Sequence, residues 1–165
     1  LLNTGKTAAM IFFIILAAGV FNSFLASAKL PQTLASVFLE TGASTWLILI
    51  GMLLFYLVLG TVMDSLAMIF LTVPIFVPII TQLDFGIPPS EVGIWFGILV
   101  LMSAEIGLIT PPVGMNLFVI NAMSKGVGIG ETYRGALPFV MSDIVRIGLL
   151  VAFPAITMSL VRLFY

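Results

Sequence analysis

Two consecutive prolines, Pro111 and Pro112, interrupt the apolar stretch of residues 91–124. Neither proline has a backbone N–H and each ring crowds the preceding turn, so a regular helix cannot continue through them. The carbonyls of residues 106–110 would then lose their helical partners. In hydrocarbon such groups are tolerated only where protein, water or a bound ion satisfies them. We therefore expect a discontinuous helix over residues 91–124, with a candidate binding site at its break.

Composition indicates that this break lies in a membrane. Of the 165 residues, 61% are hydrophobic and 8% are charged, and the mean hydropathy is +1.29, which excludes an ordinary soluble domain. The net charge of −1 gives no basic surface for nucleic acid. The chain has no histidine and no cysteine, which removes imidazole bases, thiol nucleophiles and the usual zinc or copper ligands. We expect an all-α integral membrane protein.

About three full spans are expected, one of them broken. Thr7–Ala28 is a continuous apolar stretch, long enough at about 1.5 Å per residue to cross a hydrocarbon core of about 30 Å. Residues 91–124 form the broken span. We expect half-helices over Glu91–Glu105 and over Val113 to about Ser124, with a break over Gly107–Pro112, because glycine as well as proline disfavours helical geometry. Leu137–Tyr165 contains the last span, in which we expect Pro138 to start the helix and Pro154 to kink it.

A second interruption lies within residues 45–80, for which two interpretations compete. One straight helix would be about 54 Å long, well beyond the bilayer, and would carry Asp64 near its middle. In a re-entrant hairpin, two arms of about 15 residues would each reach about 22 Å and bring residues 60–65 to a tip near the midplane. We favour the hairpin because its length fits the bilayer.

Charge placement agrees with the hairpin. Because a hairpin returns the chain to the side from which it entered, it gathers basic residues in the cytoplasm, as the positive-inside rule requires. A crossing over residues 45–80 would instead place Lys125 and Arg134 opposite Lys6. With Lys6 in the cytoplasm, the hairpin topology predicts Lys29, Glu40, Asp84 and Glu91 outside and Lys125, Arg134 and Arg146 inside.

The predicted tip and the break together supply oxygen ligands. Asp64 is the acid placed deepest, and burying it as an unpaired anion would be costly, whereas a cation would remove that penalty. The hydroxyls of Thr61, Ser65 and Thr110 and the freed carbonyls are hard donors that suit a small hard cation. Asp64 also fits a second role as the cap of a helix over Leu66–Ile80. The two roles are compatible.

Two further polar residues flank the break. Glu105 either faces the same cavity or anchors the helix bundle through an ion pair or hydrogen bond. Asn116 lies one turn into the second half-helix, where it either lines the site or packs elsewhere.

These motifs resemble one known family. Gly60-Thr-Val-Met-Asp64 followed by Pro74 and Pro78, and then Ile106-Gly-Leu-Ile-Thr-Pro-Pro-Val-Gly114 with Asn116-Leu-Phe-Val119, are similar to the second half of the large membrane subunit of tripartite ATP-independent periplasmic (TRAP) transporters. The resemblance covers nearly the whole chain. Because Leu1 leads almost directly into an apolar run without a cleavable signal, we expect the chain to be a piece of a longer permease.

The resemblance implies a secondary transporter rather than an enzyme. It implies an elevator-type fold of the ion transporter superfamily, in which this chain is the second of two inverted repeats and sodium binds between the hairpin tip and the unwound helix. Carried onto this sequence, the sodium ligands are Gly60, Met63, Asp64, Gly107, Thr110 and Pro112, and the substrate-lining residues are Ser65, Pro111 and Asn116.

The resemblance also implies the partners of such a permease. It implies sodium-coupled uptake of an organic acid, namely a C4-dicarboxylate, a sugar acid or sialic acid, across the inner membrane of a bacterium or archaeon. A soluble periplasmic binding protein delivers the substrate, and a small membrane subunit completes the transporter. Sodium is the co-transported ion, and no organic cofactor is expected.

Two other classes of function are alternatives. In a structural or assembly subunit, the broken helix would be only a packing kink. An intramembrane aspartyl protease needs two carboxylates that share a proton, here Asp64 and Glu105, but the turn before Asp64 lacks the expected Gly-x-Gly-Asp pattern.

Overall fold

The chain is helical nearly throughout. A computed structural model describes residues 1–124 and 126–164. Within these residues the helices are α1 (Leu2–Ser27), α2 (Leu30–Glu40), α3 (Thr45–Val62), α4 (Ser65–Ile80), α5 (Pro89–Ile109), α6 (Met115–Met123), α7 (Ile129–Ala152) and α8 (Pro154–Phe164). Four of them, α1, α3, α5 and α7, are long and apolar enough to cross a membrane. These helices confirm the expectation of an all-α integral membrane protein.

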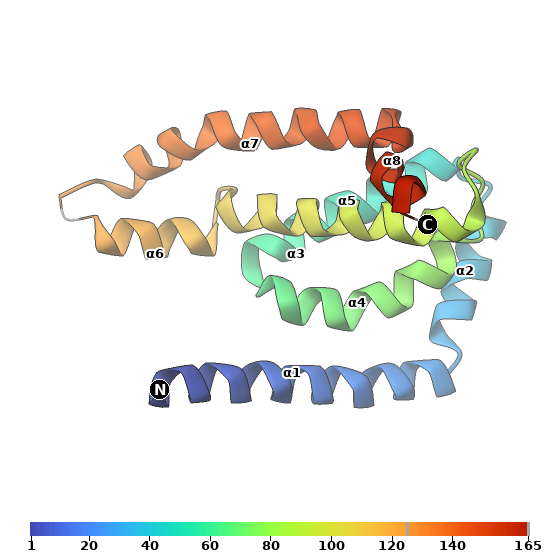
Figure 1. Cartoon of the computed structure of the whole chain (residues 1–165), viewed down its shortest axis with the longest axis horizontal. Helices are drawn as coiled ribbons and strands as arrows, with labels where there is room; N and C mark the ends of the chain where they lie inside the picture. The colour runs from blue at the N-terminus through green and yellow to red at the C-terminus, as the bar shows by residue number, and fades with distance from the viewer. Residues whose placement is uncertain (125, 165) are drawn as a thin grey trace.

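The helices are arranged so that two interruptions of the chain meet. In Figure 1, α1 lies along one edge of the molecule and α7 along the other, with α3, α4, α5 and α6 between them. The chain reverses direction between α3 and α4 at Met63 and Asp64, so these helices form a hairpin over residues 45–80. The turn of this hairpin lies beside the junction of α5 and α6 (Figure 1).

Aromatic side chains fill the core between the hairpin and α5. Tyr56 of α3 and Trp95 and Phe96 of α5 are fully buried. The Tyr56 ring meets Phe96 edge to face with centroids 6.3 Å apart, and Trp95 meets Phe85 in the same way at 5.2 Å. Such contacts fix ring orientation as well as burying apolar area. The hairpin is therefore packed closely on α5, whereas α1 and α7 are mostly exposed.

Prolines inside a helix or at the start of one leave carbonyls four residues earlier without an N–H donor, and side chains from other helices satisfy two of these carbonyls. Pro74 has no N–H to donate to the carbonyl of Phe70, and the Asn22 side chain of α1 donates to that oxygen at 2.8 Å. Pro154 releases the carbonyl of Leu150, which accepts a hydrogen bond of 2.9 Å from the Trp95 indole N–H. These bonds connect α1 to α4 and α5 to the end of α7.

The break in the discontinuous helix begins later than the sequence indicated. The first half-helix does not end before Gly107 but continues to Ile109, and the second begins at Met115. The prediction treated glycine as a residue that disfavours helices. In a membrane bundle, however, glycine also permits close helix packing, and Gly107 is buried at such a contact.

The last span also differs from its prediction. Pro138 does not start the helix but lies inside α7, which begins at Ile129, whereas Pro154 does begin a separate helix, α8. Arg146 consequently lies about 18 Å along α7 from Arg134. The side of the membrane on which each arginine lies stays a prediction. Lys125 lies outside the described residues.

Replacing Asn22 should expose the role of the Asn22–Phe70 bond. We predict that Asn22→Leu destabilises the fold, with a coupling free energy to Pro74→Ala of about 0.6–1.7 kcal/mol, because alanine at position 74 restores an N–H for the Phe70 carbonyl. The measurement is reversible unfolding in mixed micelles. Ser23→Ala is the control, since the Ser23 hydroxyl bonds only within α1. An equal cost of Asn22→Leu in the presence and absence of Pro74→Ala would contradict the assignment.

Candidate functional site: a hairpin tip against a broken helix

Two glycines bring the hairpin and α5 into backbone contact. A Cβ on Gly60 would lie 2.7 Å from the carbonyl oxygen of Ala104, and a Cβ on Gly107 would lie 2.7 Å from the Gly60 Cα. Real side chains essentially never approach so closely, so only glycine fits at either position. This contact places the last turn of α3 directly against the last turn of α5 before the break.

The hairpin tip is a short extended segment between two helices. Met63 follows the last residue of α3 and has φ −111° and ψ 153°, and Asp64 has φ −62° and ψ 136°. The Asp64 carboxylate accepts a hydrogen bond of 3.1 Å from the Ala67 N–H, so Asp64 is the N-cap of α4. The predicted capping role of Asp64 is confirmed. Ser65 follows as the first, half-buried residue of α4.

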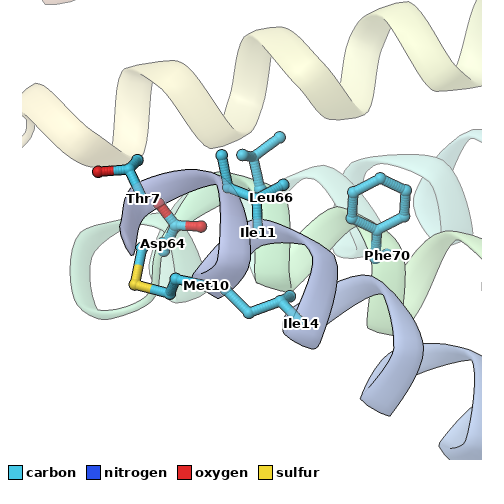
Figure 2. A pocket seen from close by; sticks show the side chains of 7 residues that line it. All are labelled: Thr7, Met10, Ile11, Ile14, Asp64, Leu66 and Phe70. Carbon is cyan, nitrogen blue, oxygen red and sulfur yellow. The ribbon is translucent and has the colours of Figure 1, made fainter. Parts of the chain in front are cut away.

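The Asp64 carboxylate points toward α1. It lines a cavity of about 200 Å³ that α1 forms with the hairpin, as Figure 2 shows. Most of the lining is apolar, and the Thr7 hydroxyl donates to the Asn3 carbonyl of its own helix at 3.1 Å. The other lining residues are Met10, Ile11, Ile14, Leu66 and Phe70. In this structure the carboxylate therefore lies at the tip but faces α1.

The break spans Thr110 to Gly114. Thr110 forms hydrogen bonds to two carbonyls in the last turn of α5. The Thr110 hydroxyl donates to the Ile106 carbonyl at 2.6 Å, and the Thr110 N–H donates to the Gly107 carbonyl at 3.1 Å. Both carbonyls therefore lack the regular i+4 amide partner, as expected, and groups of Thr110 satisfy them instead. The Thr110 hydroxyl oxygen keeps its lone pairs as acceptors. Gly114 has a left-handed φ of 56°, which glycine adopts without strain.

Tyr133 of α7 bonds the carbonyls at the other end of the break, a role that was not predicted from the sequence. Its hydroxyl lies 2.9 Å from the carbonyl oxygens of both Pro112 and Val113 and shares its proton between them. Its ring meets Phe118 of α6 edge to face, with centroids 6.4 Å apart. The only sequence feature that could have indicated this role is the position of Tyr133, a polar aromatic residue a few positions before the expected start of the last span.

The structure brings some of the predicted ligands together and separates others. Gly60 and Gly107 are in contact and buried, Met63 and Thr110 are half-buried, and Asp64 is exposed at the tip. Pro111, Pro112 and Asn116 are exposed, as is Glu105 on α5. Among the described residues there is no group of three His, Cys, Asp or Glu side chains that could hold a metal ion. Any cation bound here would need hydroxyl and carbonyl oxygens beside a single carboxylate.

Comparison with known proteins identifies the family. The family model described as "Tripartite ATP-independent periplasmic transporter, DctM component" matches residues 1–156. The chain belongs to this family. It is 40% identical over 160 residues to the C4-dicarboxylate TRAP transporter large permease protein DctM of Pseudomonas aeruginosa, and 32% identical over 162 residues to the sialic acid TRAP transporter large permease protein SiaM of Vibrio cholerae. Both relatives are named as permeases, not as enzymes.

The similarity covers the chain but only part of each relative. It extends over 97% and 98% of this chain and over 36% of each of these two relatives, so the chain spans about a third of their length. A fused protein, the isethionate TRAP transporter permease protein DctMQ of Oleidesulfovibrio alaskensis, is 30% identical over 92% of the chain and 23% of its own length. No solved structure matches the chain.

Enlarging Gly107 should separate the hairpin from α5. We predict that Gly107→Ala lowers the free energy of unfolding by about 1–3 kcal/mol, because the added methyl overlaps the Gly60 backbone. Gly97→Ala is the matched control in the same helix, since a Cβ there has no atom of another residue within 4 Å. Unfolding in mixed micelles measures both variants. A loss no larger for Gly107→Ala than for Gly97→Ala would refute the close contact.

Proposed function

We propose that this chain is the part of a TRAP permease that binds a sodium ion during uptake of an organic acid. Membership in the DctM family supports a transport role. The names of the relatives include a C4-dicarboxylate, sialic acid and isethionate, which are all organic anions. The observation that carries the proposal is the Gly60–Gly107 contact, which seats a carboxylate-bearing hairpin tip against an unwound helix.

The proposed ion site lies between the turn at Met63–Ser65 and the break at Thr110–Pro112. A sodium ion there would take oxygen ligands from the Asp64 carboxylate, the Thr110 hydroxyl and main-chain carbonyls. The Pro112 carbonyl already accepts from Tyr133, but a carbonyl oxygen has two lone pairs and can hold an ion as well. Ser65, Pro111 and Asn116 would then line the adjoining substrate pocket.

In this proposal the hairpin α3–α4 is re-entrant and α5–α6 is one discontinuous span. Both elements would move together as part of an elevator, because the Gly60–Gly107 contact joins them. The chain would lie in the inner membrane, with its permease accompanied by a small membrane subunit and by a periplasmic binding protein that delivers the organic acid. The remainder of the permease would supply the other inverted repeat.

Asp64→Asn tests the ion site without removing the helix cap. Asparagine is as good an N-cap as aspartate, so this change keeps the α4 cap while it removes the negative charge. In the purified permease that contains this chain, we predict that Asp64→Asn and Thr110→Val each weaken binding of radioactive sodium by about 10-fold or more, because the first removes the charge of the carboxylate ligand and the second removes the hydroxyl ligand.

Asp84→Asn is the control for the loss of one negative charge. The Asp84 carboxylate accepts from the Gly86 N–H in an exposed turn, and asparagine can keep that bond. Sodium affinity should be unchanged in this variant. Unchanged sodium affinity in both Asp64→Asn and Thr110→Val would reject the proposed site and leave Asp64 with its capping role alone.

A further inference from the structure

Helix α7 carries an ion pair, Asp143 with Arg146, whose arginine side chain is mostly exposed. Arg146 Nη1 lies 3.0 Å from Asp143 Oδ1, one turn earlier in the same helix. The Arg146 side chain is 61% exposed and the Asp143 side chain 24%. Asp143 meets only one nitrogen of the guanidinium, which has five N–H donors in all. Among residues 1–124 and 126–164, the other edge of the guanidinium meets no acceptor.

The pair lies within the apolar span rather than at its end. Arg146 is about 26 Å along α7 from Ile129 and about 9 Å from Ala152. Leu150, one turn beyond Arg146, accepts the hydrogen bond from Trp95, a fully buried residue of α5. Arg146 is therefore at the depth of the packed core. Charged side chains at such a depth face protein or water rather than lipid.

Distance separates this pair from the proposed ion site. Tyr133, which holds the break, and Arg146 are both on α7 and are about 20 Å apart along the helix axis. That separation is longer than a small organic acid, so Arg146 cannot bind a substrate that sits beside the break. Any further group that binds Arg146 must therefore be something other than this substrate.

Helical phase defines the face that this partner would cover. At about 100° per residue, Phe139 lies within about 20° of Arg146 around the helix, whereas Met141 lies about 140° away from it. Both side chains are exposed in this chain, at 68% for Phe139 and 57% for Met141. The side of α7 that packs on the chain itself is marked by the buried Val140. We call the side with Phe139 and Arg146 the charged face of α7; Asp143 lies between this face and the packed side (Figure 1 shows α7 along one edge).

We propose that the charged face of α7 docks against another membrane helix of the same permease, one that presents a carboxylate or a free carbonyl to Arg146. Two observations support a helix of the same permease as the occupant of this face. The chain spans about a third of the length of its relatives, so most of such a permease lies outside these residues. The unfilled edge of the guanidinium also calls for an oxygen acceptor in the same plane. The proposal does not depend on sodium binding.

Spin labels on the two sides of α7 test the proposal. The chain has no cysteine, so Phe139→Cys and Met141→Cys can each be labelled with a nitroxide after any cysteines elsewhere in the permease are replaced. The labelled permease is reconstituted into bilayers without its small subunit. Collisions with oxygen report exposure to lipid, and collisions with a water-soluble nickel chelate report exposure to water. We expect the label at 139 to be shielded from both, and the label at 141 to collide several-fold more often with oxygen.

Other results would overturn the proposal. An oxygen collision rate at 139 that is as high as that of a lipid-exposed label would mean that the charged face meets lipid, and frequent collision of the 139 label with the nickel chelate would mean a water-filled cavity. Shielding that appears only after the small subunit is added would identify that subunit as the occupant instead.

A charge variant tests the chemistry of the contact. Arg146→Gln should raise oxygen collisions at the 139 label at least about twofold, because the docked helix loses its partner. Arg134→Gln, which alters an exposed arginine near the start of α7, should not change them. If the 139 label is equally shielded with and without Arg146→Gln, Arg146 is not the docking residue.

Discussion

A proline in a membrane helix releases a backbone carbonyl that must find another donor, and this requirement organises the bundle. The carbonyl that Pro74 releases is bonded by Asn22 of α1, and the one that Pro154 releases is bonded by Trp95 of α5. Water is not available in hydrocarbon to replace these donors, so each bond holds one helix to another. Prolines that weaken single helices therefore strengthen the contacts between helices.

The same requirement explains why the break at Thr110–Gly114 is an ordered segment. Thr110 closes the end of α5, and Tyr133 of α7 holds the carbonyls on the far side. The glycine pair Gly60–Gly107 then sets the hairpin tip against this segment. The result is a fixed set of oxygen atoms at an interruption in two neighbouring elements, which is the kind of geometry that binds cations in transporters.

The sequence predicted the elements better than it predicted their contacts. Apolar length predicted α1, and the polar residues around Asp64 marked the turn between α3 and α4, because both are local properties of the chain. Gly107 was predicted to break its helix, although its packing on Gly60 keeps it helical. The roles of Tyr133 and Arg146 depend on where α7 begins, and Pro138, the predicted start of that helix, lies inside it. Such errors arise where tertiary packing outweighs local preference.

The most direct measurement of the central claim is anomalous diffraction from crystals of the permease in which thallium(I) replaces sodium. If the tip and the break enclose a monovalent cation, the anomalous map has a peak between residues 63–65 and residues 110–112, and excess sodium removes it. A map with no peak there, while the backbones of Gly60 and Gly107 remain in contact, would contradict the account.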